Sequence, residues 1–567
     1  MPATTTKLSR MLEDDDSELP AGLTAELGEP TASGVRARNV WRHEAVASSL
    51  IAGKRNPYFV ESVNDSAQRF RSNVYTLQPK PAIGQRVRVL LTSDQQNRAM
   101  SGANYEKVEK VEKVEKVEEV EEVEEVSGLL DAVFFAGDFV DHPNRASQWF
   151  DRANEDRPAF FPAMQGRLRQ LHFGGTFHGG ALLQRAPLLG ILGNHEVSGR
   201  WFPEQNDIVT MYNDSQPRWY SGIRYRDYLA GGNTADPDYV RNHSHENLTY
   251  DEMWPSPSGT ELPYWSHQYG DVFIIGLHLN RIWRLWGSSR KGKEGEAPAS
   301  VNGPNAWGFG DHLFEGIGMG TAQYDWLVSE LASSAFQNAK YKVVMAHQTV
   351  FGLGDNAYPV VAAQEAKIDY DLGSGPKTLE ITFPLTESEW DAQIAPLLGS
   401  ITSIDYAYET EEDLWRHQIG PLLVNAGVDL VFCGHSHLWN RSKVGTMHYL
   451  ESSNVGNSFG ARYDDGSESE TWLSGAFPPG DPHGRIVIAP THFNPMQAWE
   501  GFSNPLPFVS SNRLTVFSIL DTGDGAVRSY VFDTENPSAG VVLMDEFFLS
   551  GLPQSLIEVP DLRGDSG

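Results

Sequence analysis

Aspartate, asparagine and histidine side chains follow five short apolar runs of this sequence, and such side chains bind metal ions. The runs begin near Val87, Asp131, Ala186, Lys340 and Val428 and are typical of buried strands. A single polar residue after a strand is commonly a turn former or a packed histidine, but five strands that end this way favour one shared site. The residues concerned are Asp94, Asp138, Asn194, His195, His347, His435 and His437.

The donor atoms in this set suit a pair of metal ions. Ligands of α/β sheets gather where strands end at their carboxyl side, so these side chains are expected to converge. Carboxylates, imidazoles and an amide oxygen, without a thiolate, fit Mn, Fe, Zn or a similar divalent or trivalent ion. Two carboxylates and three histidines exceed the needs of one tetrahedral site. Two ions that share a ligand would lie about 3.5–4 Å apart and clamp a displacement at phosphorus.

Five motifs resemble those of the calcineurin-like metallophosphoesterases, a superfamily that includes the purple acid phosphatases. GDFVD, from Gly137, resembles the G-D-x-x-D/H/Y motif, GNHE, from Gly193, resembles G-N-H-D/E, and CGHSH, from Cys433, contains G-H-x-H. TSDQQ and MAHQ stand where the family has D-x-H and an isolated histidine after a strand. The motifs occur in the family's order across roughly residues 85–450.

The resemblance implies a role for each residue in a phosphoesterase that acts on small phosphate mono- or diesters. A metal-bound hydroxide would attack phosphorus. His195 would bind phosphate and protonate the leaving oxygen. The implied ligand set is Asp138 as the bridge, Asp94 and His437 at the first ion, and Asn194, His347 and His435 at the second.

Two positions depart from the family pattern. Gln96 stands where the family has a histidine two residues after the first aspartate. We predict that Gln96 is a weak amide-oxygen ligand of the first ion or a hydrogen-bond partner of its water, and a solvated loop glutamine is the alternative. Asp141 stands where purple acid phosphatases supply a tyrosine, so a tyrosine–iron charge-transfer site is not expected.

The order of predicted elements indicates an α/β protein, because strand-like runs alternate with helical stretches and further strands follow late in the chain. One helix is predicted after Thr321, a residue type favoured at helix N-caps. The resemblance implies a four-layer αββα sandwich of the metallophosphoesterase type with long loop insertions. Insertions are expected at residues 199–265, 281–318, 353–410 and 455–505.

Composition divides the chain into a disordered acidic tail at 1–35, an extension at 36–84, the phosphoesterase domain at 85–535 and a tail at 536–567. Within the domain, residues 106–126 place a valine at every third position. Valines at that spacing drift about 60° per repeat around a helix and form no fixed stripe. We therefore predict a solvated surface helix that is dispensable for chemistry.

The net charge of −30 disfavours nucleic acid and anionic membranes as partners. Cys433 is the one cysteine of the chain, which excludes an intrachain disulfide, and we expect it in the core. The sequence contains no stretch of about 18 apolar residues and no signal-like N-terminus. These features predict a soluble cytoplasmic protein and leave its oligomeric state undefined.

Two other functions compete with a phosphoesterase of small substrates. A metal-dependent nuclease is disfavoured by the acidic charge, and a non-catalytic metal-binding scaffold is disfavoured by the intact GNHE. Turnover of an aryl phosphate would separate the scaffold from both enzymes. Side chains set aside from the site are His243 and His245 in a polar H-x-H loop, Arg200 as a solvated arginine or a phosphate contact, and His278 and His448 as packing residues.

Overall fold

The computed structural model describes most of the chain. The described residues are 2–18, 36–64, 66–114, 130–151, 157–198, 247–282, 312–313, 316–348, 353, 365–382, 387–407, 414–453, 455, 461, 486–503 and 505–549. Among them, no helix has the length and apolar character needed to cross a membrane.

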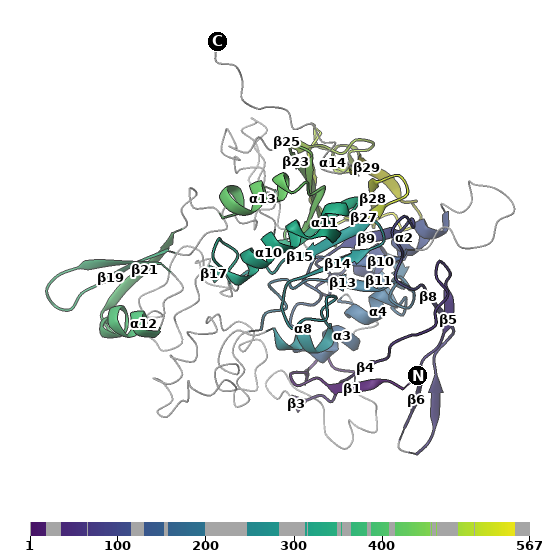
Figure 1. Ribbon diagram of the computed structural model, residues 1–567, viewed down its shortest axis with the longest axis horizontal. Helices are drawn as coiled ribbons and strands as arrows, with labels where there is room; N and C mark the ends of the chain where they lie inside the picture. The colour runs from purple at the N-terminus through teal and green to yellow at the C-terminus, as the bar shows by residue number, and fades with distance from the viewer. Residues whose placement is uncertain are drawn as a thin grey trace, which may run out of the picture.

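Two large β-sheets form the centre of the molecule (Figure 1). The six-stranded sheet has the order β13 (Leu188–Gly190), β10 (Ala132–Phe135), β9 (Arg88–Thr92), β27 (Leu514–Asp521), β28 (Ala526–Asp533) and β29 (Val542–Phe548). The eight-stranded sheet has the order β14 (Trp265–Tyr269), β15 (Val272–Gly276), β18 (Tyr341–Gln348), β22 (Leu430–Gly434), β24 (Met447–Ser452), β23 (Trp439–Val444) and β25 (Ile486–Ile488), with β26 (Phe508–Val509) also paired to β23. Each sheet is parallel in the part that bears on the site: β9, β10 and β13 in one, and β15, β18, β22 and β24 in the other.

Alternating side chains give each sheet two apolar faces. Val89 and Leu91 of β9 belong to the same buried cluster as Val343 and Met345 of β18, so the two sheets share one core. Leu90, between the two β9 residues, points to the opposite face and joins a second cluster. This period of two is the ordinary geometry of an extended strand, and it explains why the apolar runs in the sequence are continuous.

Helices line the outer faces of both sheets. Helices α2 (Ser101–Val114), α3 (Ala146–Phe150), α4 (Phe160–Met164) and α8 (Leu248–Met253) contribute to the cluster on the six-stranded sheet. Helices α10 (Ala322–Ala332), α11 (Ser334–Asn338), η3 (Trp415–Ile419) and α13 (Gly420–Asn425) contribute to the cluster on the eight-stranded sheet. The predicted N-cap is confirmed, because the Thr321 side chain accepts from the Tyr324 amide. The arrangement is a mixed α/β fold, as the sequence predicts.

Buried polar contacts join the two sheets to each other. Arg441 of β23 donates to Asp545 of β29 through Nε at 2.7 Å and Nη2 at 2.9 Å, and both side chains are buried. The indole nitrogen of Trp439 donates to the Ser529 hydroxyl of β28 at 3.0 Å. A buried arginine whose fork meets a carboxylate has a fixed geometry, so these contacts set how one sheet lies over the other.

Both predicted tails differ from the structure where it describes them. Leu8, Met11 and Leu12 are buried in the cluster on the six-stranded sheet or beside it, although the sequence predicts disorder over 1–35. The acidic composition of this segment hides these apolar residues, which pack on the core. The acids that follow them are paired as well, since Arg145 Nε lies 2.8 Å from Asp14 Oδ2. At the other end, β29 lies in the six-stranded sheet, so residues 542–548 belong to the domain and not to a tail.

The described part of the triplet repeat is packed through its valines, although Lys110 remains exposed. Val108 is fully buried, Val111 is nearly so, and both join the cluster on the six-stranded sheet. The Lys107 ammonium lies 3.9 Å from the centroid of the Phe532 ring. A drift of about 60° per triplet still keeps two or three successive valines on one side of a helix, which is enough to bury the first turns. The rest of the repeat, 115–126, lies outside the described residues.

Smaller elements extend from the two sheets. The predicted insertion at 353–410 contains β19 (Glu365–Tyr370), β20 (Lys377–Thr382), α12 (Glu387–Gln393), η1 (Ala395–Leu397) and β21 (Ile401–Ala407), which lie apart from the large sheets (Figure 1). The remaining pairs are β1 (Thr4–Lys7) with β4 (Trp41–Glu44), β2 (Leu12–Glu13) with β3 (Arg36–Ala37), β5 (Asn56–Tyr58) with β8 (Tyr75–Leu77), β6 (Glu61–Val63) with β7 (Arg69–Arg71), β11 (Gln170–His172) with β12 (Gly175–Phe177), and β16 (Arg281–Ile282) with β17 (His312–Leu313). Helix α14 (Pro495–Ala498) follows β25.

Candidate metal centre

The predicted ligands lie at the carboxyl ends of parallel strands from both sheets. In the six-stranded sheet, β9, β10 and β13 are neighbours, and the chain reaches Asp94, Asp138 and Asn194 shortly after each. In the eight-stranded sheet, β18 and β22 are neighbours; His347 is in β18, and His435 and His437 follow β22. Parallel neighbours end at the same edge, so each sheet brings three ligands to one place.

Two groups of potential ligands share one carboxylate. Asp138, His347 and His435 have donor atoms within 4.8 Å of one another, and so do Asp94, Asp138 and His437. All five residues are buried. Carboxylate and imidazole donors at this spacing could hold metal ions, and Asp138 would contact both.

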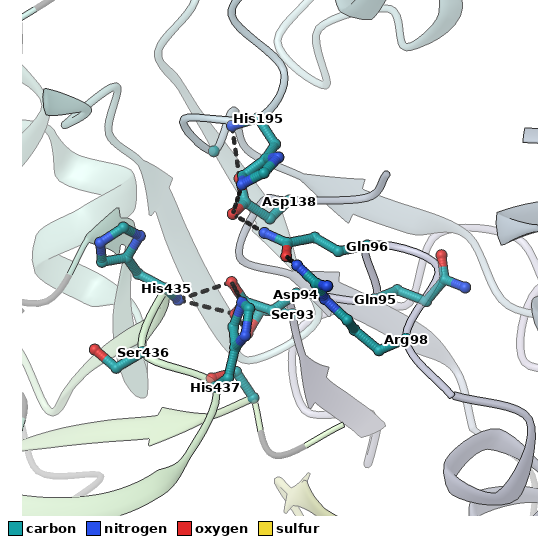
Figure 2. A network of polar contacts seen from close by, with 12 residues as sticks. Ser93, Asp94, Gln95, Gln96, Arg98, Asp138, His195, His435, Ser436 and His437 are labelled. Atoms are coloured by element: carbon teal, nitrogen blue, oxygen red, sulfur yellow. Dashed lines mark hydrogen bonds and ion pairs between the residues drawn. The ribbon is translucent and has the colours of Figure 1, made fainter. Parts of the chain in front are cut away.

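Hydrogen bonds hold the two carboxylates, and those from His435 to Asp94 join the two sheets. The backbone N–H of His435 donates to both carboxylate oxygens of Asp94, at 2.9 Å each, as Figure 2 shows. The Ser93 hydroxyl donates to the same carboxylate. The backbone N–H of His195 donates to Asp138 at 2.9 Å. These bonds orient the carboxylates before any ion arrives.

Three acceptor atoms converge around His347. Its Nδ1 lies 2.7 Å from the Ala136 carbonyl oxygen, which can only accept, so Nδ1 carries a hydrogen and a neutral ring presents a lone pair at Nε2. That Nε2 lies 3.0 Å from Asn194 Oδ1 and 3.2 Å from Asp138 Oδ2. Asn194 Oδ1 also lies 3.0 Å from Nδ1 of His435. Acceptors crowded in this way require a proton or a cation among them, and a metal ion fits that requirement.

The electrostatics of the buried carboxylates favour the same conclusion. Burial, with the nearby Asp138 charge, raises the pKa of Asp94 to about 7, although His347 opposes the rise. Burial also raises the pKa of Asp138, but His347 and His195 outweigh it and hold that pKa below its usual range. Burial lowers the pKa of His347, and the Asp138 carboxylate overcomes this and raises it to about 9. The Asp138 carboxylate therefore favours a positive charge, a proton or a metal ion, beside the Nε2 of His347.

Four ligands have a left-handed backbone that only glycine adopts freely. The φ angles are 54° at Asp94, 59° at Asp138, 82° at His435 and 55° at His437. Residues other than glycine seldom occupy this region, and where they do the surrounding structure must hold them there. The concentration of such residues in one place marks it as a site whose geometry is maintained at a cost.

Two glycines allow the ligand loops to approach closely. A Cβ on Gly193 would lie 2.1 Å from Asp138 Oδ1, and a Cβ on Gly434 would lie 2.3 Å from Asp94 Oδ2. Both contacts are far inside van der Waals distance. The glycines that precede the GNHE and GHSH ligands are therefore required by the space that the carboxylates occupy.

Two buried glutamates, whose roles the sequence analysis did not identify, hold the ligand turns. Glu196 accepts backbone N–H groups of Asp138 at 2.7 Å, Phe139 at 2.8 Å and Gly193 at 2.8 Å. Glu451 accepts the backbone N–H of Ser436 at 2.8 Å, between the two ligand histidines. The signal for Glu451 was present, because it too ends an apolar run, MHYLE.

His195 lies beside the two ligand groups and belongs to neither. Its Nδ1 is 2.8 Å from the Asp141 carbonyl oxygen, which leaves Nε2 to face inward, 3.9 Å from Asp138 Oδ2. Its side chain is 16% exposed, whereas that of Asp138 is 1% exposed. A ring held through Nδ1–H with Nε2 turned inward can give up a proton from Nε2 when it is the imidazolium, which suits general acid catalysis.

Gln96 is oriented differently from its predicted role as an amide-oxygen ligand. Its Nε2 donates to Asp138 Oδ2, and its Oε1 accepts from Arg98 (Figure 2). If the Gln96 amide were turned over, its oxygen would face the Asp138 carboxylate and its NH₂ group would face the Arg98 guanidinium, and neither pair could form a hydrogen bond. The two neighbours therefore fix the orientation of the amide. Gln96 therefore presents its donor group, and not its acceptor, to the bridging aspartate.

The remaining side chains named from the sequence have structural surroundings or lie outside the described residues. Cys433 is buried in the cluster on the eight-stranded sheet, as predicted. His278 is buried, and its backbone pairs with the Gln323 amide. His448 packs on Phe547 with ring centroids 4.5 Å apart, and burial lowers its pKa to about 3. The residues outside the described ranges are Arg200, His243 and His245.

Comparison with known proteins gives structural likenesses only. No family model and no curated protein sequence matches the chain. A purple acid phosphatase isolated from yellow lupin (Lupinus luteus) seeds is similar with a TM-score of 0.43 and 13% identity, over 96% of this chain and 66% of that one, so this chain spans about two thirds of its length. The GAP50 anchor of the inner membrane complex of Plasmodium is similar with a TM-score of 0.32 and 11% identity, over 83% of this chain and 92% of that one. At identities and TM-scores this low, these likenesses carry no information on function, which must be argued from the side chains of this chain.

Proposed function

We propose that this chain is a dinuclear metal-dependent phosphoesterase that hydrolyses small phosphate mono- or diesters. The observation that carries the proposal is the pair of buried ligand groups that share Asp138. One group would hold its ion with Asp94, Asp138 and His437, and the other with Asp138, His347 and His435, with Asn194 Oδ1 close to both histidines.

Two bound ions would supply Lewis acidity toward the phosphoryl group and would make water acidic enough to attack at neutral pH. The protein's own residues prepare the site for that chemistry. His435 and Ser93 orient the Asp94 carboxylate, and the backbone N–H of His195 orients that of Asp138. In its imidazolium form His195 would donate the Nε2 proton to the leaving oxygen, while its Nδ1–H stays bonded to the Asp141 carbonyl and keeps Nε2 turned toward the site.

The two groups are expected to prefer different ions. The group with Asp94 contains two carboxylates and one imidazole, and Gln96 adds no oxygen to it. The group with His347 contains two imidazoles and one carboxylate. Oxygen-rich sites favour harder ions such as Mn, and imidazole-rich sites suit Zn or Fe.

We also propose the four-layer αββα sandwich for the domain that holds the site. Three apolar clusters support it: one shared by the two sheets and one between each sheet and its helices. In such an arrangement, the ligand loops of both sheets open at one edge.

Elemental analysis of the purified protein, together with a substrate panel, tests the proposed function. The panel contains 4-nitrophenyl phosphate, bis(4-nitrophenyl) phosphate and single-stranded DNA. We expect about two metal ions per chain and turnover of one or both aryl esters that a chelator abolishes. Hydrolysis of DNA alone would favour a nuclease. Two bound ions without any turnover would favour a metal-binding scaffold.

A further inference from the structure

One side of the metal centre is more exposed than the rest. The side chains of Asp138, His347 and His437 are at most 2% exposed, whereas those of Arg98 and Asp141 are 22% and 25% exposed. His195 is exposed on this same side, since its ring contacts Asp141. Among the described side chains around the centre, Arg98, Asp141 and His195 are therefore more exposed to solvent than the buried carboxylates and imidazoles.

Arg98 is held in place on this more exposed side by two neighbours, Gln96 and Asp141. Its Nε lies 3.2 Å from Gln96 Oε1, and its Nη2 contacts the same oxygen and lies 3.2 Å from Asp141 Oδ1. Among the contacts of the described residues, these use Nε and Nη2, and a guanidinium carries two more N–H donors on Nη1. Gln96 in turn donates to Asp138, so one side chain separates Arg98 from the shared carboxylate.

We propose that Arg98 and His195 together form an anion-binding subsite. In this subsite Arg98 binds the third terminal oxygen of a phosphate monoester, and the site therefore selects monoesters over diesters. The inference depends on the proposed function and specifies its substrate class. Arginine is suited to this role because its planar guanidinium can donate two parallel hydrogen bonds to phosphate oxygens. Asp141 already pairs with Arg98 at 3.2 Å and offsets part of its charge, so a phosphate oxygen would be recognised mainly through the N–H donors on Nη1.

The number of terminal oxygens explains the selectivity. A monoester has three terminal oxygens, so two can face the metal pair while the third remains for Arg98 and carries negative charge. A diester has two terminal oxygens, and its second ester group would occupy the position of the third. Arg98 would therefore gain a charged hydrogen bond with a monoester and meet a neutral substituent with a diester.

The test compares wild type, Arg98→Gln and Arg98→Lys on 4-nitrophenyl phosphate and bis(4-nitrophenyl) phosphate. We expect Arg98→Gln to lower kcat/KM for the monoester by about 10- to 100-fold, the value of a charged hydrogen bond, and to change the diester by less than about threefold. Arg98→Lys should recover part of the monoester rate, because it keeps the charge and loses the fork. Arg528→Gln is the matched control, because Arg528 is similarly exposed at 25% and pairs with Asp524 in the turn before β28 and with Glu546 of β29.

Two further measurements separate the possible failures. Metal content must stay equal to wild type, since a loss of metal in Arg98→Gln would mean that Arg98 acts through Gln96 on the ligands and would overturn the proposal. Equal losses on both esters, or no loss on either, would overturn it as well. Calorimetry with inorganic phosphate and with dimethyl phosphate gives a readout without turnover. If wild type hydrolyses neither ester, the proposed function fails, and the Arg98 subsite then stands or falls on whether Arg98→Gln weakens the binding of inorganic phosphate alone.

Discussion

The two sheets contribute different chemistry to the metal centre. The six-stranded sheet supplies oxygen donors, Asp94, Asp138 and Asn194, and the eight-stranded sheet supplies nitrogen donors, His347, His435 and His437. Neither sheet contains a complete ligand group, because each group combines carboxylates from one sheet with imidazoles from the other. Each ligand group therefore forms only when the two sheets are packed together, and the proposed metal affinity would depend on that packing.

The two halves also differ in how their turns are held. Among the described residues, the groups that donate to Glu196, in the oxygen half, are backbone N–H groups, which cannot reorient. Glu451, in the nitrogen half, accepts one backbone N–H and the side-chain amide of Asn440, at 2.6 Å, and that amide can rotate. The oxygen half is consequently the less adaptable of the two, although both are equally buried.

The largest effect is expected from the residue that both ligand groups share. Asp138→Asn should lose both ions and lower activity by more than about 100-fold, beyond the range typical of residues outside the ligand set. His437→Ala should lose one ion, because His437 belongs to a single group. Elemental analysis beside kcat/KM measures both. Equal metal loss in the two variants would contradict the shared role of Asp138.

The imidazole that comes from the oxygen half should behave unlike the three from the nitrogen half. His195→Ala should keep both ions and slow turnover by about 10²–10⁴-fold, the range of general acid–base help. The loss should grow with the pKa of the leaving alcohol, because a poor leaving group needs the proton more. Rates for a series of aryl and alkyl phosphates, with metal analysis, provide the check; metal loss like that of Asp138→Asn would make His195 a ligand.

The two glutamates allow a direct comparison of the halves. Glu196→Gln should lower the free energy of unfolding by about 1–3 kcal/mol, because a glutamine amide nitrogen would face backbone N–H groups that have no other orientation. Glu451→Gln should cost less, since the Asn440 amide can turn to present its oxygen. Urea denaturation of both metal-free variants beside wild type, at a pH above about 8 where both glutamates are ionised, measures the difference. A greater loss in Glu451→Gln would reverse the assignment of the rigid half.

The pH dependence of stability should show the strain that both halves share without metal. Burial is the largest cause of three raised pKa values. The pKa of Asp94 is raised to about 7, and those of Glu196 and Glu451 are raised to about 8. Unfolded carboxyls titrate near about pH 4, so between about pH 4 and pH 8 the folded protein binds more protons than the unfolded chain. The free energy of unfolding with a chelator should therefore fall as pH rises through that window. Bound Mn should reduce the fall. If the protein measured with a chelator gains stability over the same pH window, the raised pKa values of these carboxyls would be refuted.

The ligand positions could be predicted from the sequence because they depend on local pattern. An apolar run of strand length fixes where a strand ends, and parallel strands end at one edge, so Asp94, Asp138 and His435 could be placed together without coordinates. The glycines of the same motifs are local in sequence as well. The requirement for glycine at these positions is not local, because the Cβ clashes involve carboxylates from other segments.

The features that the sequence did not indicate depend on contacts between distant segments. The direction of the Gln96 amide is set by Arg98 on one side and Asp138 on the other, and an amide has no intrinsic preference between its two ends. The burial of Met11 and Val108 depends on an apolar face that other parts of the chain complete. By itself the sequence determined which atoms are delivered to the edge of each sheet, through the period and length of its strands. The tertiary structure alone decided how those atoms face one another, because orientation depends on neighbours that are far apart along the chain.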